Sequence, residues 1–95
     1  MGRWRYTLKF GEALRNAIDD ENYEAILDAL VACFTEINKA LPEDYESYEL
    51  EKDLEEISII KENMEDGEDV EDDINYELSD FYDLCDGLRI WVGGI

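Results

Sequence analysis

The stretch that decides the fold is YEAILDALVACFTEINKAL, residues 23–41. Its apolar side chains recur every three or four residues, the spacing that gathers them on one face of an α-helix. The alanines between them favour helix, and Pro42 disfavours helical backbone at the residue before it. We therefore predict a helix that ends at Pro42, with Asp19 or Asp20 as its N-cap. The apolar stripe consists of Tyr23, Ile26, Leu27, Leu30, Phe34, Ile37 and Leu41.

Two further amphipathic segments follow, at about 43–64 and 70–91. Gly67 interrupts the acidic run between them and predicts a break in the helix, while Gly93 and Gly94 follow the second segment, as glycine often does after a helix. The two stripes contain Leu50, Leu54, Ile57 and Met64, and then Val70, Ile74, Leu78, Phe81, Cys85, Leu88 and Val92.

The N-terminal segment RWRYTLKF, residues 3–10, is compatible with two structures. Apolar and polar residues alternate along it, which is typical of a strand, and the only other segment that offers it a partner is LRIWV at 88–92. Phe10, Leu14 and Ile18 instead recur at helical spacing and favour a helix over about 7–19. Helix is the preferred interpretation, so the chain predicts one all-α domain over 1–95, a bundle of three to four helices.

The charge of the chain is strongly acidic and unevenly distributed. Twenty-seven Asp and Glu oppose eight Lys and Arg, for a formal net charge of −19, and residues 43–86 contain twenty of the acids with only Lys52 and Lys61 as bases. Direct binding to nucleic acid and to anionic membranes is disfavoured, because both depend on Lys and Arg. The expected partner is therefore basic.

The remaining composition indicates an intracellular protein. Cys33 and Cys85 belong to no metal-ligand or redox spacing and lie on apolar helix faces, so we expect buried, reduced thiols. No apolar stretch approaches the length of a membrane span, and no secretory leader is present. These features predict the cytoplasm as the location.

Catalysis and cofactor binding have little support in the sequence. The chain contains no His, which removes the commonest general base and most transition-metal sites, and it has no phosphate-binding glycine loop. Residues 66–77 have acids at both ends of a calcium-loop length, but Val70 stands at a ligand position and Glu71 at the position that requires Gly. We expect no enzyme activity, no cofactor and no dedicated metal site, only loose association of Mg²⁺ or Ca²⁺ with the carboxylates.

The dense acids themselves are the candidate partner-binding site. Like charges at i, i+3 and i, i+4 destabilise a helix, and few bases relieve them here, which favours a role in binding over solubility alone. Carboxylates spaced about 6 Å apart along two helices approach the charge density of duplex DNA. The predicted site residues are Glu55, Glu56, Glu62, Glu65, Asp66, Glu68, Asp69, Glu71, Asp72, Asp73, Glu77 and Asp80.

In size, charge and helical pattern the chain resembles the small acidic proteins that phages and other mobile elements use against host defences, among them DNA-mimicking anti-restriction proteins and anti-CRISPR inhibitors. The resemblance covers residues 43–86 best and rests on composition. It implies stoichiometric inhibition in the host cytoplasm, with the carboxylates occupying the nucleic-acid groove of a nuclease or another basic nucleic-acid-binding protein.

Two alternatives remain. In the first, the chain is a helical adaptor that binds a protein partner through apolar residues Trp4, Tyr6 and Leu8, and its charge serves solubility. In the second, the chain buffers divalent cations. The nearly neutral residues 1–42 are also compatible with a homodimer contact.

Overall fold

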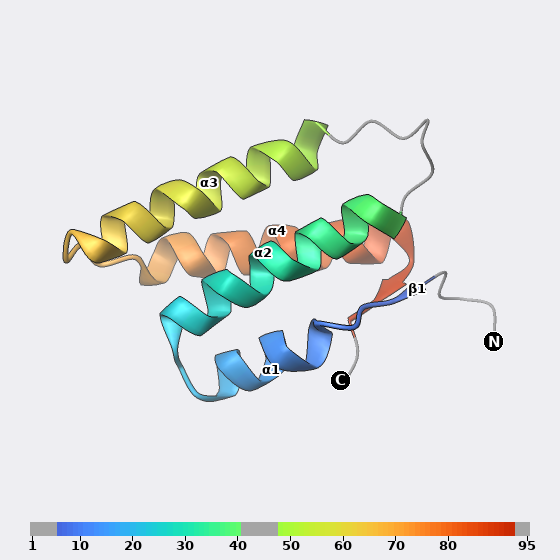
Figure 1. Ribbon diagram of the computed structural model, residues 1–95, viewed down its shortest axis with the longest axis horizontal. Coiled ribbons are helices and arrows are strands. Elements are labelled where there is room, and N and C mark those ends of the chain that lie inside the picture. Colours follow the sequence, from blue (N-terminus) through green and yellow to red (C-terminus); the bar gives the residue numbers. More distant parts are fainter. Residues whose placement is uncertain (1–5, 41–47, 93–95) are drawn as a thin grey trace.

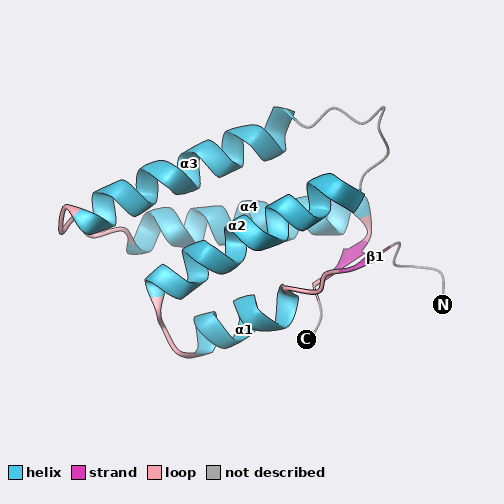
Figure 2. Ribbon diagram, in the orientation of Figure 1, coloured by secondary structure: helices cyan, strands magenta, loops and turns pink. Residues whose placement is uncertain are grey.

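The computed structural model describes residues 6–40 and 48–92, and within these ranges it contains four α-helices and two very short β-strands (Figure 1). The predicted small helical bundle is confirmed, and the helices dominate the described chain (Figure 2). The elements are β1 (Tyr6–Thr7), α1 (Gly11–Asp19), α2 (Tyr23–Ala40), α3 (Tyr48–Glu65), α4 (Glu71–Leu88) and β2 (Ile90–Trp91).

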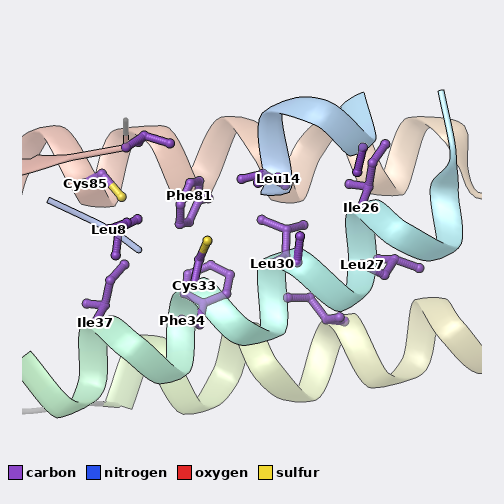
Figure 3. Packing of buried hydrophobic residues seen from close by; sticks show 14 of the residues in the cluster. Leu8, Leu14, Ile26, Leu27, Leu30, Cys33, Phe34, Ile37, Phe81 and Cys85 are labelled. Carbon is purple, nitrogen blue, oxygen red and sulfur yellow. The ribbon is translucent and has the colours of Figure 1, made fainter. Parts of the chain in front are cut away.

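Helix α2 is the centre of the bundle and contacts α1, α3 and α4. Its predicted stripe is buried from Ile26 to Ile37, whereas Tyr23 is partly exposed and Leu41 lies outside the described residues. Phe34 of α2 meets Phe81 of α4 edge to face, with ring centroids 5.3 Å apart and planes at 85° (Figure 3), an arrangement that aromatic pairs favour.

The stripes of α3 and α4 complete the core. Leu50 and Ile57 of α3 are buried, while Leu54 and Met64 pack against them with partial exposure. The buried residues of α4 include Ile74, Phe81 and Cys85, and Leu78 and Leu88 are partly buried. Val70, just before α4, and Val92, just after β2, are also buried. Cys33 and Cys85 are free and buried, as predicted.

The strand interpretation of the N-terminal segment holds for Tyr6–Thr7 only, and residues 3–5 lie outside the described residues. The predicted helical start near residue 7 is wrong, because α1 begins at Gly11. β1 pairs in parallel with β2, matching Tyr6 with Ile90 and Thr7 with Trp91, and the backbone N–H of Leu8 donates to the carbonyl of Trp91 at 2.9 Å. This pairing satisfies backbone groups that a longer α1 would use. For the same reason α4 ends at Leu88 and not near residue 91.

Gly11 permits the close approach of these two segments. A Cβ at this position would lie 1.4 Å from the carbonyl oxygen of Val92, a distance at which no side chain fits. Leu8 is 3% exposed and belongs to the core, so the adaptor contact predicted through Leu8 is wrong; Tyr6 is partly buried, and Trp4 lies outside the described residues.

The helix boundaries follow local capping. The side chain of Asn22 caps α2, with its Oδ1 accepting from the N–H of Ala25 at 3.1 Å; the predicted caps Asp19 and Asp20 are wrong because α1 extends to Asp19 and Asp20 is its C-cap. Gly67, at φ +86°, ends α3 as predicted. Residues 41–47, which include Pro42 and the expected start of the third helix, lie outside the described ranges.

Candidate functional site

Most of the predicted partner-binding residues lie exposed on α3, on the turn after it and on the start of α4. We call this set the acidic surface. It consists of Glu55, Glu62, Glu65, Asp66, Glu68, Asp69, Glu71, Asp72 and Asp73.

The other three predicted residues are less accessible. Glu56 and Asp80 are half-buried, and Glu77 is 1% exposed. Glu77 therefore cannot belong to an exposed docking surface, which corrects the sequence-based assignment. The cause is its position on α4. Ile74 and Phe81 lie three residues before and four residues after Glu77, so all three side chains are on the helix face that packs against the core.

The turn between α3 and α4 is well defined, so it holds its acids in place. After Gly67 reverses the chain, the N–H of Glu68 donates to the carbonyl of Asn63 at 3.0 Å. The carboxylate of Asp69 accepts from the N–H of Glu71 at 3.1 Å, and Glu71, Asp72 and Asp73 occupy the first turn of α4. Acids there interact favourably with the helix dipole, which offsets part of their mutual repulsion.

The single base within residues 55–73 is already engaged. Lys61 is the only Lys or Arg in that range, and its ammonium lies 2.6 Å from Oδ1 of Asp28 on α2. No residue of the acidic surface forms a salt bridge with any residue that the structure describes. The acidic surface therefore keeps its negative charge uncompensated.

The negative potential extends to α2. Burial raises the pKa of Tyr23, and the charges of Glu71, Asp69 and Glu21 raise it further. The negative charges near the start of α4 thus disfavour ionisation of the Tyr23 phenol at the start of α2. This places the high charge density near the end of the bundle where those two helices begin.

A second group of carboxylates lies inside the contact between α3 and α4, and sequence reasoning missed it. Asp53, Glu56 and Glu77 each bring one carboxylate oxygen within 4.8 Å of the others; we call them the buried carboxylate cluster. Asp53 is 6% exposed, although it was not among the predicted residues. The available signal was the i, i+3 spacing of Asp53 with Glu56 and of Glu77 with Asp80, which many other acid pairs in this chain share.

The electrostatics of Glu77 are unusual. Burial, an interaction with Glu56, and the charges of Asp53 and Asp80 raise the pKa of Glu77 to about 8. Neither of its carboxylate oxygens has a hydrogen-bond partner among the residues that the structure describes. A hydrogen bond with Glu56 requires a proton on one of the two groups, because an ionised carboxylate only accepts. When both are ionised, Glu77 has no donor.

Glu36 on α2 is also buried, but its environment is the opposite. Its carboxylate accepts from the hydroxyl of Tyr6 at 2.7 Å, from the N–H of Lys9 at 2.7 Å and from the N–H of Phe10 at 3.2 Å. Burial acts to raise the pKa of Glu36, but these hydrogen bonds and the charge of Lys9 hold it below its ordinary value. Glu36 thus anchors the segment before α1 and has a structural role.

None of the helices in the described part of the chain is both long enough and apolar enough to cross a bilayer. Comparisons with protein-family models, with curated proteins and with solved structures found no match to this chain. Its function is therefore inferred from its own residues.

Proposed function

We propose that this chain is a non-enzymatic binding protein whose acidic surface occupies the basic nucleic-acid groove of a nuclease or another nucleic-acid-processing protein. Bound there, it excludes the nucleic acid and acts as an inhibitor or decoy. Charge complementarity of this kind raises association rates and selects basic partners.

The engagement of Lys61 carries this proposal. A solvated face ordinarily mixes acids with bases, yet the one base within residues 55–73 turns to Asp28 on α2. Nine exposed carboxylates are left without a counter-charge among the described residues. Apart from the acids that cap or begin α4, these carboxylates form no hydrogen bond with a described residue, and they repel one another. A partner that supplies the missing positive charge gives them a role.

The dimensions of α3 and α4 also support it. Each contains 18 residues and is about 27 Å long at 1.5 Å per residue. One duplex strand presents a phosphate about every 3.4 Å, whereas carboxylates one helical turn apart are separated by about 6 Å. The carboxylates of two neighbouring acidic helices together approach the spacing of the phosphates that a basic groove binds.

The test compares two variants that lose the same charge in different places. Glu55→Gln, Glu62→Gln, Glu65→Gln and Glu68→Gln together remove four exposed acids from the acidic surface. The matched control removes four exposed acids from α1, its C-cap and the start of α2, by Glu12→Gln, Asp19→Asn, Asp20→Asn and Glu24→Gln.

Each protein is immobilised and exposed to bacterial lysate, and captured proteins are identified and quantified. Exposed ion pairs contribute about 0.2–1 kcal/mol each, so the loss of four should weaken binding of a captured nucleic-acid-binding protein by at least about fourfold. The control should bind like the wild type. Equal loss in both variants would mean that only net charge matters and would contradict the proposal.

A second candidate function, a helical adaptor, is favoured by one observation. A cavity of about 640 Å³ opens between the segment before α1 and the C-terminal half of α2. Phe10, which is 48% exposed, lines it together with Lys9 and Lys39. An apolar side chain of a protein partner fits such a site. Binding here should be lost in Phe10→Ser and should change little with salt, whereas binding through the acidic surface should weaken steeply with salt.

A further inference from the structure

The buried carboxylate cluster contains one acid, Glu77, whose buried oxygens no described residue satisfies. Asp53 and Glu56 are three residues apart on α3, so both side chains reach α4 from the same face, and Glu77 reaches them from α4. Their oxygen atoms lie within 4.8 Å of one another. Asp80, one turn beyond Glu77 and half-buried, adds a fourth acid close by.

Glu77 supplies an independent indication of a ligand. The side chain is 1% exposed, and within residues 6–40 and 48–92 neither of its buried oxygens finds a hydrogen-bond partner. Buried charged groups are normally paired with an opposite charge or coordinate a metal. Glu36 shows how this fold satisfies a buried carboxylate when it uses its own donors, and Glu77 has no such donors.

A proton solves only part of the problem. One proton shared between Glu77 and Glu56 converts one carboxylate oxygen into a donor, and the second oxygen of Glu77 still lacks a partner. The negative charge of Asp80 close by also disfavours an ionised Glu77. A divalent cation neutralises two negative charges and is coordinated by oxygen atoms of several carboxylates at once.

The surroundings of the cluster provide access and space for water. A cavity of about 240 Å³ borders Glu56 and Glu77 and also includes Asn63 and Asp73. A second cavity of about 200 Å³ borders Asp53, Glu56 and Asp80. A water molecule takes about 30 Å³ in the liquid, so both cavities hold enough water to complete the coordination of a hydrated cation.

We propose that Asp53, Glu56 and Glu77 bind one hard divalent cation of the Mg²⁺ and Mn²⁺ class between α3 and α4. Such ions prefer carboxylate and water oxygens, and the absence of His and Cys from the cluster disfavours Zn²⁺ and Cu²⁺. The cation cross-links the two helices that present the acidic surface. The site forms in the absence of any partner, so its test is independent of the proposed function.

The experiment titrates the full chain with Mn²⁺ alone, after treatment with a chelator. Loss of the sharp paramagnetic resonance of free aqueous Mn²⁺ measures binding, and thermal unfolding with and without Mn²⁺ measures stabilisation. A background of about 150 mM KCl screens diffuse attraction to the exposed acids. The variants are Glu77→Gln and Glu56→Gln, and the matched control is Glu65→Gln, which removes one exposed charge from the same region.

The wild type should bind one Mn²⁺ per chain saturably, be displaced by Mg²⁺, and melt at higher temperature when Mn²⁺ is present, because the ion binds only the folded state. Removal of either Glu should weaken the affinity at least about tenfold, whereas Glu65→Gln should bind like the wild type. Circular dichroism establishes that each variant is folded. If Glu77→Gln does not fold, the affinity of Glu56→Gln provides the test.

The proposal is overturned if the wild type shows no saturable binding, which would leave only a shared proton. It is equally overturned if folded Glu77→Gln or Glu56→Gln binds like the wild type, which would mean diffuse counter-ion attraction.

Discussion

A carboxylate oxygen of Glu77 on α4 lies within 4.8 Å of a carboxylate oxygen of Glu56 on α3, inside the contact between the two helices. Two acids at this distance in a buried site cannot both be ionised without cost. The relationship affects the stability of the metal-free protein, the affinity of the proposed cation site and the rigidity of the helices beneath the acidic surface.

The first prediction concerns pH and the metal-free protein. Burial, Glu56, Asp53 and Asp80 raise the pKa of Glu77 from 4.5 to about 8 in the folded state. Between these values the folded state binds more protons than the unfolded state, so the contribution of Glu77 to stability is present at low pH and lost as pH rises towards about 8. Glu77→Gln removes this dependence.

At pH 9 with chelator, Glu77→Gln should have a free energy of unfolding higher than the wild type by about 2–4 kcal/mol. At pH 5 the difference should nearly vanish, because Glu77 is then protonated in the folded wild type. Urea unfolding across this range measures both values, with Glu65→Gln as the exposed control. A constant difference at all pH values would show that Glu77 does not titrate in this range.

The second prediction concerns the anchor of the N-terminal segment. Glu36→Ala removes a carboxylate that accepts from Tyr6, Lys9 and Phe10 and leaves those donors without their partner. It should lower the free energy of unfolding by about 2–3 kcal/mol, and Tyr6→Phe, which removes one of the donors, by about 1 kcal/mol. Denaturant titration checks both. Because the pKa of Glu36 is lowered in the folded state, its contribution should be lost as pH falls through that pKa.

The third prediction compares two glycines. Gly11→Ala places a Cβ 1.4 Å from the carbonyl oxygen of Val92, whereas a Cβ at Gly87 meets nothing within 4 Å. Gly11→Ala should therefore destabilise the protein by about 3 kcal/mol or more, since backbone and not a flexible side chain must move. Gly87→Ala, within α4, should stabilise it by about 0.5–1 kcal/mol. Thermal unfolding distinguishes the two, and the same sign for both variants would contradict the described packing of β2 against α1.

The fourth prediction concerns the thiols. Burial raises the pKa of Cys33 and of Cys85 to about 12, and the thiolate is the reactive form. Native protein treated with iodoacetamide at pH 8 should remain unmodified for hours, and protein in denaturant should take up two labels, as mass spectrometry reports. Rapid labelling of the native protein would indicate that the core around Phe34 and Phe81 opens readily.

Local patterns in the sequence were sufficient to predict the helices, their buried faces and the break at Gly67, because helical periodicity and glycine conformation depend on near neighbours. The contacts between distant segments were not predictable in this way. The pairing of Tyr6 with Ile90 replaced the expected first turn of helix, and Asn22, not Asp19 or Asp20, became the cap of α2 because α1 continues to Asp19.

The same distinction applies to the candidate site. The exposed acids follow from composition and helical spacing, whereas the buried carboxylate cluster depends on how α3 and α4 align. Among twenty-seven acids, Glu77 is buried and Asp73, four residues earlier, is exposed. Glu77 stands between Ile74 and Phe81 of the predicted apolar stripe, a spacing that the sequence-based prediction did not use. That Ile74 and Phe81 are buried was predictable, but the meeting of Glu77 with Asp53 and Glu56 depends on how α3 and α4 pack.

The central claim, that the acidic surface binds a basic nucleic-acid groove, is tested most directly on a purified captured partner. Its affinity for the wild-type chain is measured over about 50–300 mM salt, with and without competing duplex DNA. We predict that affinity falls steeply with salt, that DNA and the chain exclude each other, and that removal of Glu55, Glu62, Glu65 and Glu68 charges weakens binding more than the matched change on α1 and α2. Affinity that is insensitive to salt and unaffected by DNA would contradict the claim.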